Sequence, residues 1–232
     1  MTPDQRRRQL LLAVAGSLVS GAPSLAQSGA GVGHSAARGA LGELAPAQNT
    51  IPPERKQIGP FPEDKDRVFF FFSFECGFSA MVHEAVSEWG STVPAKVRFR
   101  PVPIVLGDAD LAASNAHSFV RTLYPNQLVE FERTAYAAVQ RGKPYASPET
   151  YRQALRLVLG DGAKQVRLTK QSTEDILARA LRNARLSARY QVDTSPCFAV
   201  GGTLVLSANQ TNGDYQALIA LVNGAISRIL EG

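Results

Sequence analysis

The sequence predicts an α/β fold in which a block of helices is inserted between the strands of a single sheet. Three features predict it: an apolar run of strand length at 68–74, a segment at 108–190 with helical patterns only, and a hairpin signature at 197–206. A strand, a helical block and a closing hairpin together imply one domain that carries an insertion.

The chain begins with the pattern of a cleavable signal peptide, which we place at residues 1–26. Arginines at 6–8 form a basic head, residues 10–19 are apolar, and 24–26 are the small residues of a cleavage site. The run is too short to cross a bilayer of about 30 Å, and no later segment approaches that length, so we expect no membrane span. Arg7-Arg8 before residues 9–11 also resembles a twin-arginine signal. Both export routes lead to the periplasm or otherwise out of the cytoplasm.

Residues 27–66 are rich in Ala, Gly, Pro and charge without a stable apolar period, so we expect a flexible spacer, with the domain spanning 67–232. The whole chain has 25 basic and 20 acidic side chains, and removal of the signal leaves 22 and 19. This mild balance lacks the dense basic patch that nucleic-acid binding requires, so we expect no nucleic-acid partner.

The first part of the domain predicts a strand, a helix and a second strand. Val68–Phe74 is continuously apolar, as in a central strand covered on both faces, and the following helix is amphipathic. The segment 97–102 alternates as a strand does. A helix between two strands predicts that they pair in parallel.

The insertion, at about 108–190, predicts four helices, at 111–123, 127–140, 148–159 and 173–190. Proline and glycine separate them, and Ser147-Pro148 is a typical helix opening. Strands at 197–200 and 203–206 around Gly201-Gly202 predict the hairpin, and 212–230 predicts a last amphipathic helix.

The candidate chemistry centres on Cys76, where the first strand turns into its helix. Backbone N–H groups and the helix dipole favour an anion there, so a thiolate that attacks disulfides is physically sensible. A buried, inert cysteine at a strand end is the alternative. The second candidate feature is the loop Thr194-Ser195-Pro196, where a cis proline would expose backbone for an extended substrate and a trans proline would only start a strand.

These features together resemble the DsbA-like branch of the thioredoxin superfamily. In that family a strand leads into a Cys-x-x-Cys helix start, a helical domain is inserted, and a cis-proline loop precedes a hairpin and a last helix. Residues 67–231 follow the same order. The resemblance implies a thioredoxin fold with an inserted helical domain, exchange chemistry on exported proteins that contain cysteines, no cofactor, and substrate docking at Thr194, Ser195 and Pro196.

The chain departs from the family at the second cysteine, where Cys76-Gly77-Phe78-Ser79 has a serine. Such a site cannot store electrons as a dithiol, although Cys76 can still form a mixed disulfide and the Ser79 hydroxyl could donate a hydrogen bond to the thiolate. We therefore predict an extracytoplasmic thiol-disulfide exchange protein, an oxidoreductase or isomerase, with a redox partner protein that resets Cys76 as a further expected partner.

Two alternatives remain open. One is a redox-silent thioredoxin-fold chaperone or envelope-assembly binding module that keeps the docking groove. The other is a glutathione transferase, because glutathione transferases with a DsbA-like fold use a serine at the motif. The export signal argues against this alternative.

Cys197 directly follows the proline loop and leaves two arrangements open. A disulfide between Cys76 and Cys197 would restore a two-electron couple or act as a static link. Alternation along the strand would instead point Cys197 into the core.

Other candidates are weaker. The three histidines, His34, His83 and His117, have no metal-ligand spacing, so we expect buried or solvated histidines and no metal. A basic stripe on the last inserted helix is expected to be solvated, with an acidic partner surface as the alternative. It consists of Arg179, Arg182, Arg185 and Arg189.

Overall fold

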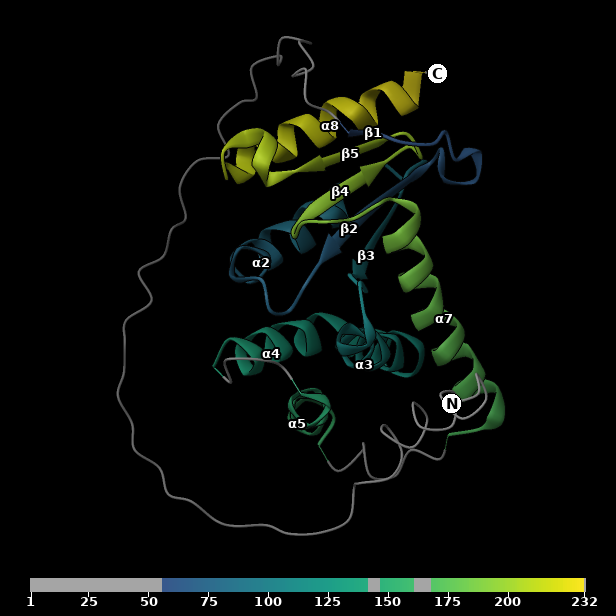
Figure 1. The fold of residues 1–232 in the computed structure, drawn as a ribbon, viewed down its shortest axis with the longest axis vertical. Coiled ribbons are helices and arrows are strands. Elements are labelled where there is room, and N and C mark those ends of the chain that lie inside the picture. Colours follow the sequence, from purple (N-terminus) through teal and green to yellow (C-terminus); the bar gives the residue numbers. More distant parts are fainter. Residues whose placement is uncertain (1–55, 142–146, 161–167, 232) are drawn as a thin grey trace. The chain divides into compact units, whose positions relative to one another are not determined.

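The computed structural model describes residues 56–141, 147–160 and 168–231; the expected signal peptide and most of the expected spacer lie outside them. The described residues contain a five-stranded sheet in the order β1-β5-β4-β2-β3 (Figure 1). β2 pairs in parallel with β3, and the other pairs in this sheet are antiparallel. The strands are β1 (Lys56–Gln57), β2 (Arg67–Phe72), β3 (Arg98–Pro103), β4 (Cys197–Val200) and β5 (Leu204–Ser207).

The helices lie where the sequence predicts them, with ends shifted by at most a few residues. Those of the described part are α2 (Gly77–Thr92), α3 (Leu111–Leu123), α4 (Leu128–Arg141), α5 (Pro148–Leu159), α7 (Lys170–Arg189) and α8 (Tyr215–Glu231). Four of them come between β3 and β4 along the chain. The predicted α/β class with a helical insertion is therefore confirmed.

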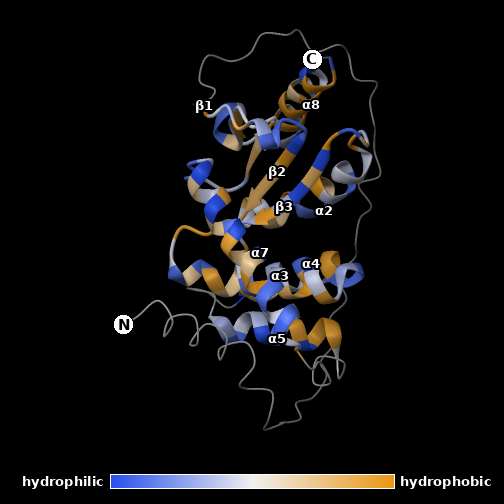
Figure 2. Ribbon diagram, turned by 90° about the vertical axis from the view of Figure 1, so that its right-hand side faces the viewer, coloured by the Kyte–Doolittle hydropathy of each residue, from blue (hydrophilic) through white to orange (hydrophobic). Residues whose placement is uncertain are grey.

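Alternation along β2 divides the core into two clusters. Phe70 and Phe72 face one cluster, which includes apolar residues of α2, α8 and the inserted helices, whereas Phe69 and Phe71 face a second cluster with the end of α7. Because both faces of β2 are buried, the strand is hydrophobic along most of its length (Figure 2).

The fold begins earlier than the boundary expected at Arg67. Lys56–Gln57 pairs with β5, and Asp64 is buried, accepting a hydrogen bond of 2.8 Å from the Tyr190 hydroxyl. The composition of this segment is that of a spacer. Its order comes from pairing with the edge strand of the hairpin and from a hydrogen bond with a buried tyrosine, and composition reveals neither contact.

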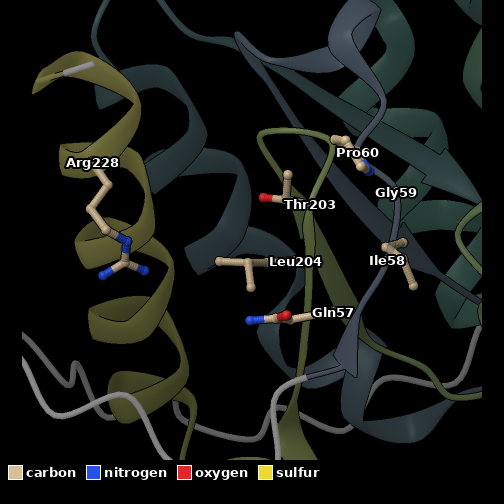
Figure 3. Close-up of a pocket in the computed structure, with 7 residues that line it drawn as sticks. All are labelled: Gln57, Ile58, Gly59, Pro60, Thr203, Leu204 and Arg228. Carbon is tan, nitrogen blue, oxygen red and sulfur yellow. The ribbon is translucent and has the colours of Figure 1, made fainter.

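A hollow of about 540 Å³ opens at the turn of the β4–β5 hairpin (Figure 3). It lies beyond the end of β4 that is away from Pro196, so it is separate from the candidate site. Its lining consists of Gln57, Ile58, Gly59, Pro60, Thr203, Leu204 and Arg228.

Candidate functional site

Cys76 is the residue that caps the N-terminus of α2. Its sulfur accepts a hydrogen bond from the backbone N–H of Ser79, with 3.4 Å between the atoms. The backbone N–H of Cys76 in turn donates to the carbonyl of Ser73 at 3.1 Å, which closes the turn after β2. The thiol is half-buried. It therefore combines access to solvent with a position at the positive end of a helix dipole.

The proline loop lies directly against this thiol. Cys76 Sγ donates to the carbonyl oxygen of Ser195 at 3.2 Å, and the Ser195–Pro196 peptide bond is cis. Ser195 Oγ accepts from the backbone N–H of Ser73 at 2.9 Å. The two segments that the sequence singles out, far apart along the chain, thus meet at one site.

Ser79 has a different role from the one expected. Its hydroxyl, fully buried, lies 2.8 Å from Ser195 Oγ, and only its backbone N–H reaches the sulfur of Cys76. The expected hydroxyl-to-sulfur hydrogen bond is therefore not formed, because Ser195 Oγ is the partner that the hydroxyl takes. Ser79 connects the helix start to the proline loop.

Thr194 presents backbone groups that have no partner in the described ranges. It is half-buried, precedes the start of β4, and forms no hydrogen bond with any residue of the described ranges. Its N–H and C=O are therefore unoccupied beside the thiol, as pairing with an extended peptide requires.

Cys197 does not bond to Cys76. Both thiols are free, and Cys197 is fully buried in the second core cluster, on the face of the sheet that carries Phe69 and Phe71. Burial, followed by the charge of Asp193, raises the pKa of Cys197 to about 12. The disulfide considered above is absent because strand alternation turns this side chain away from the face covered by α2.

Comparison with known proteins agrees with this geometry. No family model matches the chain. The chain is 22% identical over 178 residues to the thiol:disulfide interchange protein DsbA of Bordetella parapertussis, and equally to that of Bordetella bronchiseptica; each alignment covers 72% of this chain and 79% of the relative.

Solved structures of DsbA proteins show the same fold. The DsbA of Klebsiella pneumoniae superposes with a TM-score of 0.60 at 15% identity, over 80% of this chain and 100% of that chain. A variant of Pseudomonas aeruginosa DsbA gives 0.63 at 18%, over the same shares of the two chains. The chain thus resembles the DsbA proteins in sequence and shares their fold. Its thioredoxin fold with an inserted helical domain is confirmed.

This DsbA-like chain also contains a buried polar triad that sequence reasoning missed. The Glu132 carboxylate accepts hydrogen bonds from Nε2 of His83 at 2.7 Å and from Nε2 of His117 at 2.8 Å. The three residues come from α4, α2 and α3, and all are buried. The expectation of buried histidines is met for these two, and His34 lies outside the described residues. The overlooked signal was a carboxylate on the apolar face of α4, beside Phe131 and Ala135.

The triad is ionised at its centre. Burial by itself would raise the pKa of Glu132, but the hydrogen bonds from His117 and His83 outweigh it and lower that pKa to about 2. Burial lowers the pKa of His117. Tyr136 feels the charges of both Glu132 and Cys76: burial, then these two charges, raise its pKa well above the usual value. Ser79 is near its hydroxyl without reaching hydrogen-bond geometry.

In the described ranges, no group of three or more His, Cys, Asp or Glu side chains is arranged to hold a metal ion. None of the helices of this part is long and apolar enough to cross a membrane.

Proposed function

We propose that this chain is an extracytoplasmic thiol-disulfide exchange protein that acts on protein disulfides through a single nucleophilic cysteine, Cys76. The observation that carries the proposal is the placement of a half-buried thiol at a helix start, against the carbonyl of Ser195. The relatives named above are thiol:disulfide interchange proteins, which supports the same chemistry.

The reaction begins with the Cys76 thiolate. Its sulfur attacks one sulfur of a substrate disulfide, a mixed disulfide forms, and the second substrate sulfur leaves as a thiolate. The proton of Cys76 passes to solvent before the attack. Negative charge on the sulfur is stabilised by the backbone N–H of Ser79.

Release of the substrate then needs a second thiol. Ser79 cannot provide one, and Cys197 is buried on the other face of the sheet. We infer that another thiolate of the substrate attacks the mixed disulfide, which restores Cys76 and leaves the substrate with a rearranged disulfide. This cycle is an isomerisation and consumes no oxidant or reductant. A small thiol or a redox partner protein would instead release the substrate reduced.

Substrate docking is assigned to the proline loop. The unoccupied backbone of Thr194 lies beside the thiol, and Ser195 is held by Ser73 and Ser79. An extended segment that pairs with Thr194 would bring its disulfide to Cys76. Export rests on the signal pattern at 1–26 and agrees with this chemistry, since protein disulfides persist outside the cytoplasm.

The test is mixed-disulfide trapping with a protein substrate that carries scrambled disulfides, read by intact mass after acid quenching. The wild-type protein is expected to form an adduct and to accelerate recovery of the native substrate. Cys76→Ala is expected to do neither, and Cys197→Ala to retain both. Absence of a wild-type adduct would overturn the proposal. If Cys76→Ala still suppressed substrate aggregation as well as wild type did, the result would support the alternative of a redox-silent binding module.

A gain-of-function variant sharpens this test. Ser79→Cys introduces a thiol three residues after Cys76, in the position of the family's second cysteine. The trapped adduct is then expected to disappear, because the new thiol displaces the substrate within the same molecule. Persistence of the adduct at the wild-type level would contradict the assigned geometry.

A further inference from the structure

Four arginines gather where β3, α3 and α7 meet. The helices α3 and α7 pack together, and α3 also contacts β3 (Figure 1). Arg100 Nη2 donates to Asn183 Oδ1 at 2.6 Å, and Arg179 Nε donates to Thr122 Oγ1 at 3.2 Å. Arg121 precedes Thr122 and Arg182 precedes Asn183 along the chain. The members are Arg100, Arg121, Arg179 and Arg182, called the arginine cluster below.

Within the described ranges, no carboxylate lies at ion-pair distance from the arginine cluster, although the charge of Glu132 acts on Arg121 and that of Asp175 acts on Arg179 over a longer range. None of its four side chains forms an ion pair with any residue in the described ranges. On the same helix, by contrast, Arg189 pairs with Glu63 and Asp64. The expected solvated stripe is thus divided: one end is neutralised within the fold, and the other end joins cations from two further elements.

Part of this positive charge is buried and unsatisfied. Nε of Arg100 and Nη1 of Arg121 are inaccessible to solvent and have no hydrogen-bond partner. Burial, followed by the charges of Arg121, Arg179 and Arg182, lowers the pKa of Arg100 to about 10. Buried N–H donors on charged groups normally find acceptors, since leaving one unpaired is unfavourable. Like charges held together add to that cost.

We propose that the arginine cluster binds a tetrahedral oxyanion, a phosphate or a phosphoryl group. Guanidinium groups donate paired N–H bonds that match such an anion, and a phosphate carries close to two negative charges at neutral pH. A single carboxylate would offset one of the four charges, whereas a phosphate offsets about two and presents more acceptor oxygens. Arg182 is exposed, so the anion approaches from its side. The unpaired donors of Arg100 and Arg121 are closed to solvent in this structure, so they reach the anion only after their side chains turn towards it.

The test is thermal unfolding of the purified protein at constant ionic strength while chloride is replaced by inorganic phosphate. The wild-type melting temperature is expected to rise by roughly 3–6 °C for each tenfold increase in phosphate beyond its dissociation constant. Arg121→Gln is expected to lose this rise and, in chloride alone, to melt no lower than wild type, because repulsion within the cluster is relieved. The matched control is Arg185→Gln, which removes an exposed charge from the same helix and should keep the rise.

The proposal is overturned if wild type shows no rise, or if Arg121→Gln rises as much as wild type does. Arg182→Gln is a second test variant that is expected to fold normally, because the Arg182 side chain is exposed. Phosphate should show weaker phosphorus NMR line broadening with this variant than with wild type. Co-sedimentation with vesicles containing phosphatidic acid, whose headgroup is a phosphate monoester, but not with phosphatidylcholine vesicles, and its loss in Arg182→Gln would identify a lipid headgroup as the source. Phosphate binding without co-sedimentation would identify a free anion. These measurements do not involve Cys76 and are independent of the exchange chemistry.

Discussion

The two cysteines of this chain lie close to the same sheet in opposite environments. Cys76 caps a helix, is half-buried, and has its sulfur bonded to a backbone N–H and a backbone carbonyl. Cys197 is fully buried among apolar side chains on the other face, where its pKa is raised to about 12. The difference teaches that one side chain can serve chemistry or packing, depending on the dipoles and solvent around its sulfur.

The largest expected effect is on alkylation of the native protein at neutral pH. A thiol with a pKa near 12 has a thiolate fraction at least about a thousandfold below that of an ordinary thiol. Native wild type should therefore take up one label, Cys76→Ser none, and Cys197→Ser one, as counted by intact mass. Rapid labelling of Cys197 in the folded protein would break the comparison.

The next effect concerns the triad beneath the helix that carries Cys76. Glu132→Ala leaves two buried histidines without their shared acceptor, and we expect a loss of about 3–5 kcal/mol in the free energy of unfolding. Glu132→Gln should cost less, about 1–2 kcal/mol, because an amide can still bond to both imidazoles. Urea denaturation measures both, and equal losses would show that the charge, rather than the hydrogen bonds, stabilises this region.

The triad also predicts the direction of acid sensitivity. The pKa of Glu132 in the folded protein is depressed to about 2 from 4.5, so its contribution is present above pH 4.5 and is lost as the pH falls towards 2. The pKa of His117 is lowered from 6.5, so stability begins to fall below pH 6.5, where the unfolded chain takes up a proton first. Glu132→Gln should remove the lower part of this pH dependence; an unchanged profile would exclude Glu132 as its source.

The smallest expected effect separates the cysteines by stability. Cys197→Ser places a hydroxyl in an apolar cluster and should cost about 1–3 kcal/mol, whereas Cys76→Ser, at an N-cap that serine suits, should change stability by about 0.5 kcal/mol or less. Because the pKa of Cys197 is raised from 9.0, wild type should also lose stability as the pH rises above 9, towards 12. Cys197→Ala should lack that alkaline loss. A larger cost at Cys76 than at Cys197 would reverse the assignment of roles.

The sequence by itself determined the elements and the two segments of the candidate site. Apolar runs, alternation and helix-start residues are local properties, and they placed β2, the inserted helices, the hairpin and α8 within a few residues of their observed ends. The spacing of Cys76 and the proline loop within that order indicated the DsbA-like fold. Among the described residues, composition misjudged 56–66, whose partners are distant in the chain.

Tertiary structure alone decided which atoms meet. Because the proline loop packs on α2, the Ser79 hydroxyl forms a hydrogen bond with Ser195 Oγ, and the Ser79 backbone N–H donates to the sulfur of Cys76. The sheet face on which Cys197 lies depended on the register of β4, which the sequence left open. Glu132 accepts hydrogen bonds from histidines on two other helices, and the arginine cluster consists of residues from three elements. Local periodicity specifies the face of an element but not its partner, because partners separated by many residues are chosen only when whole elements pack.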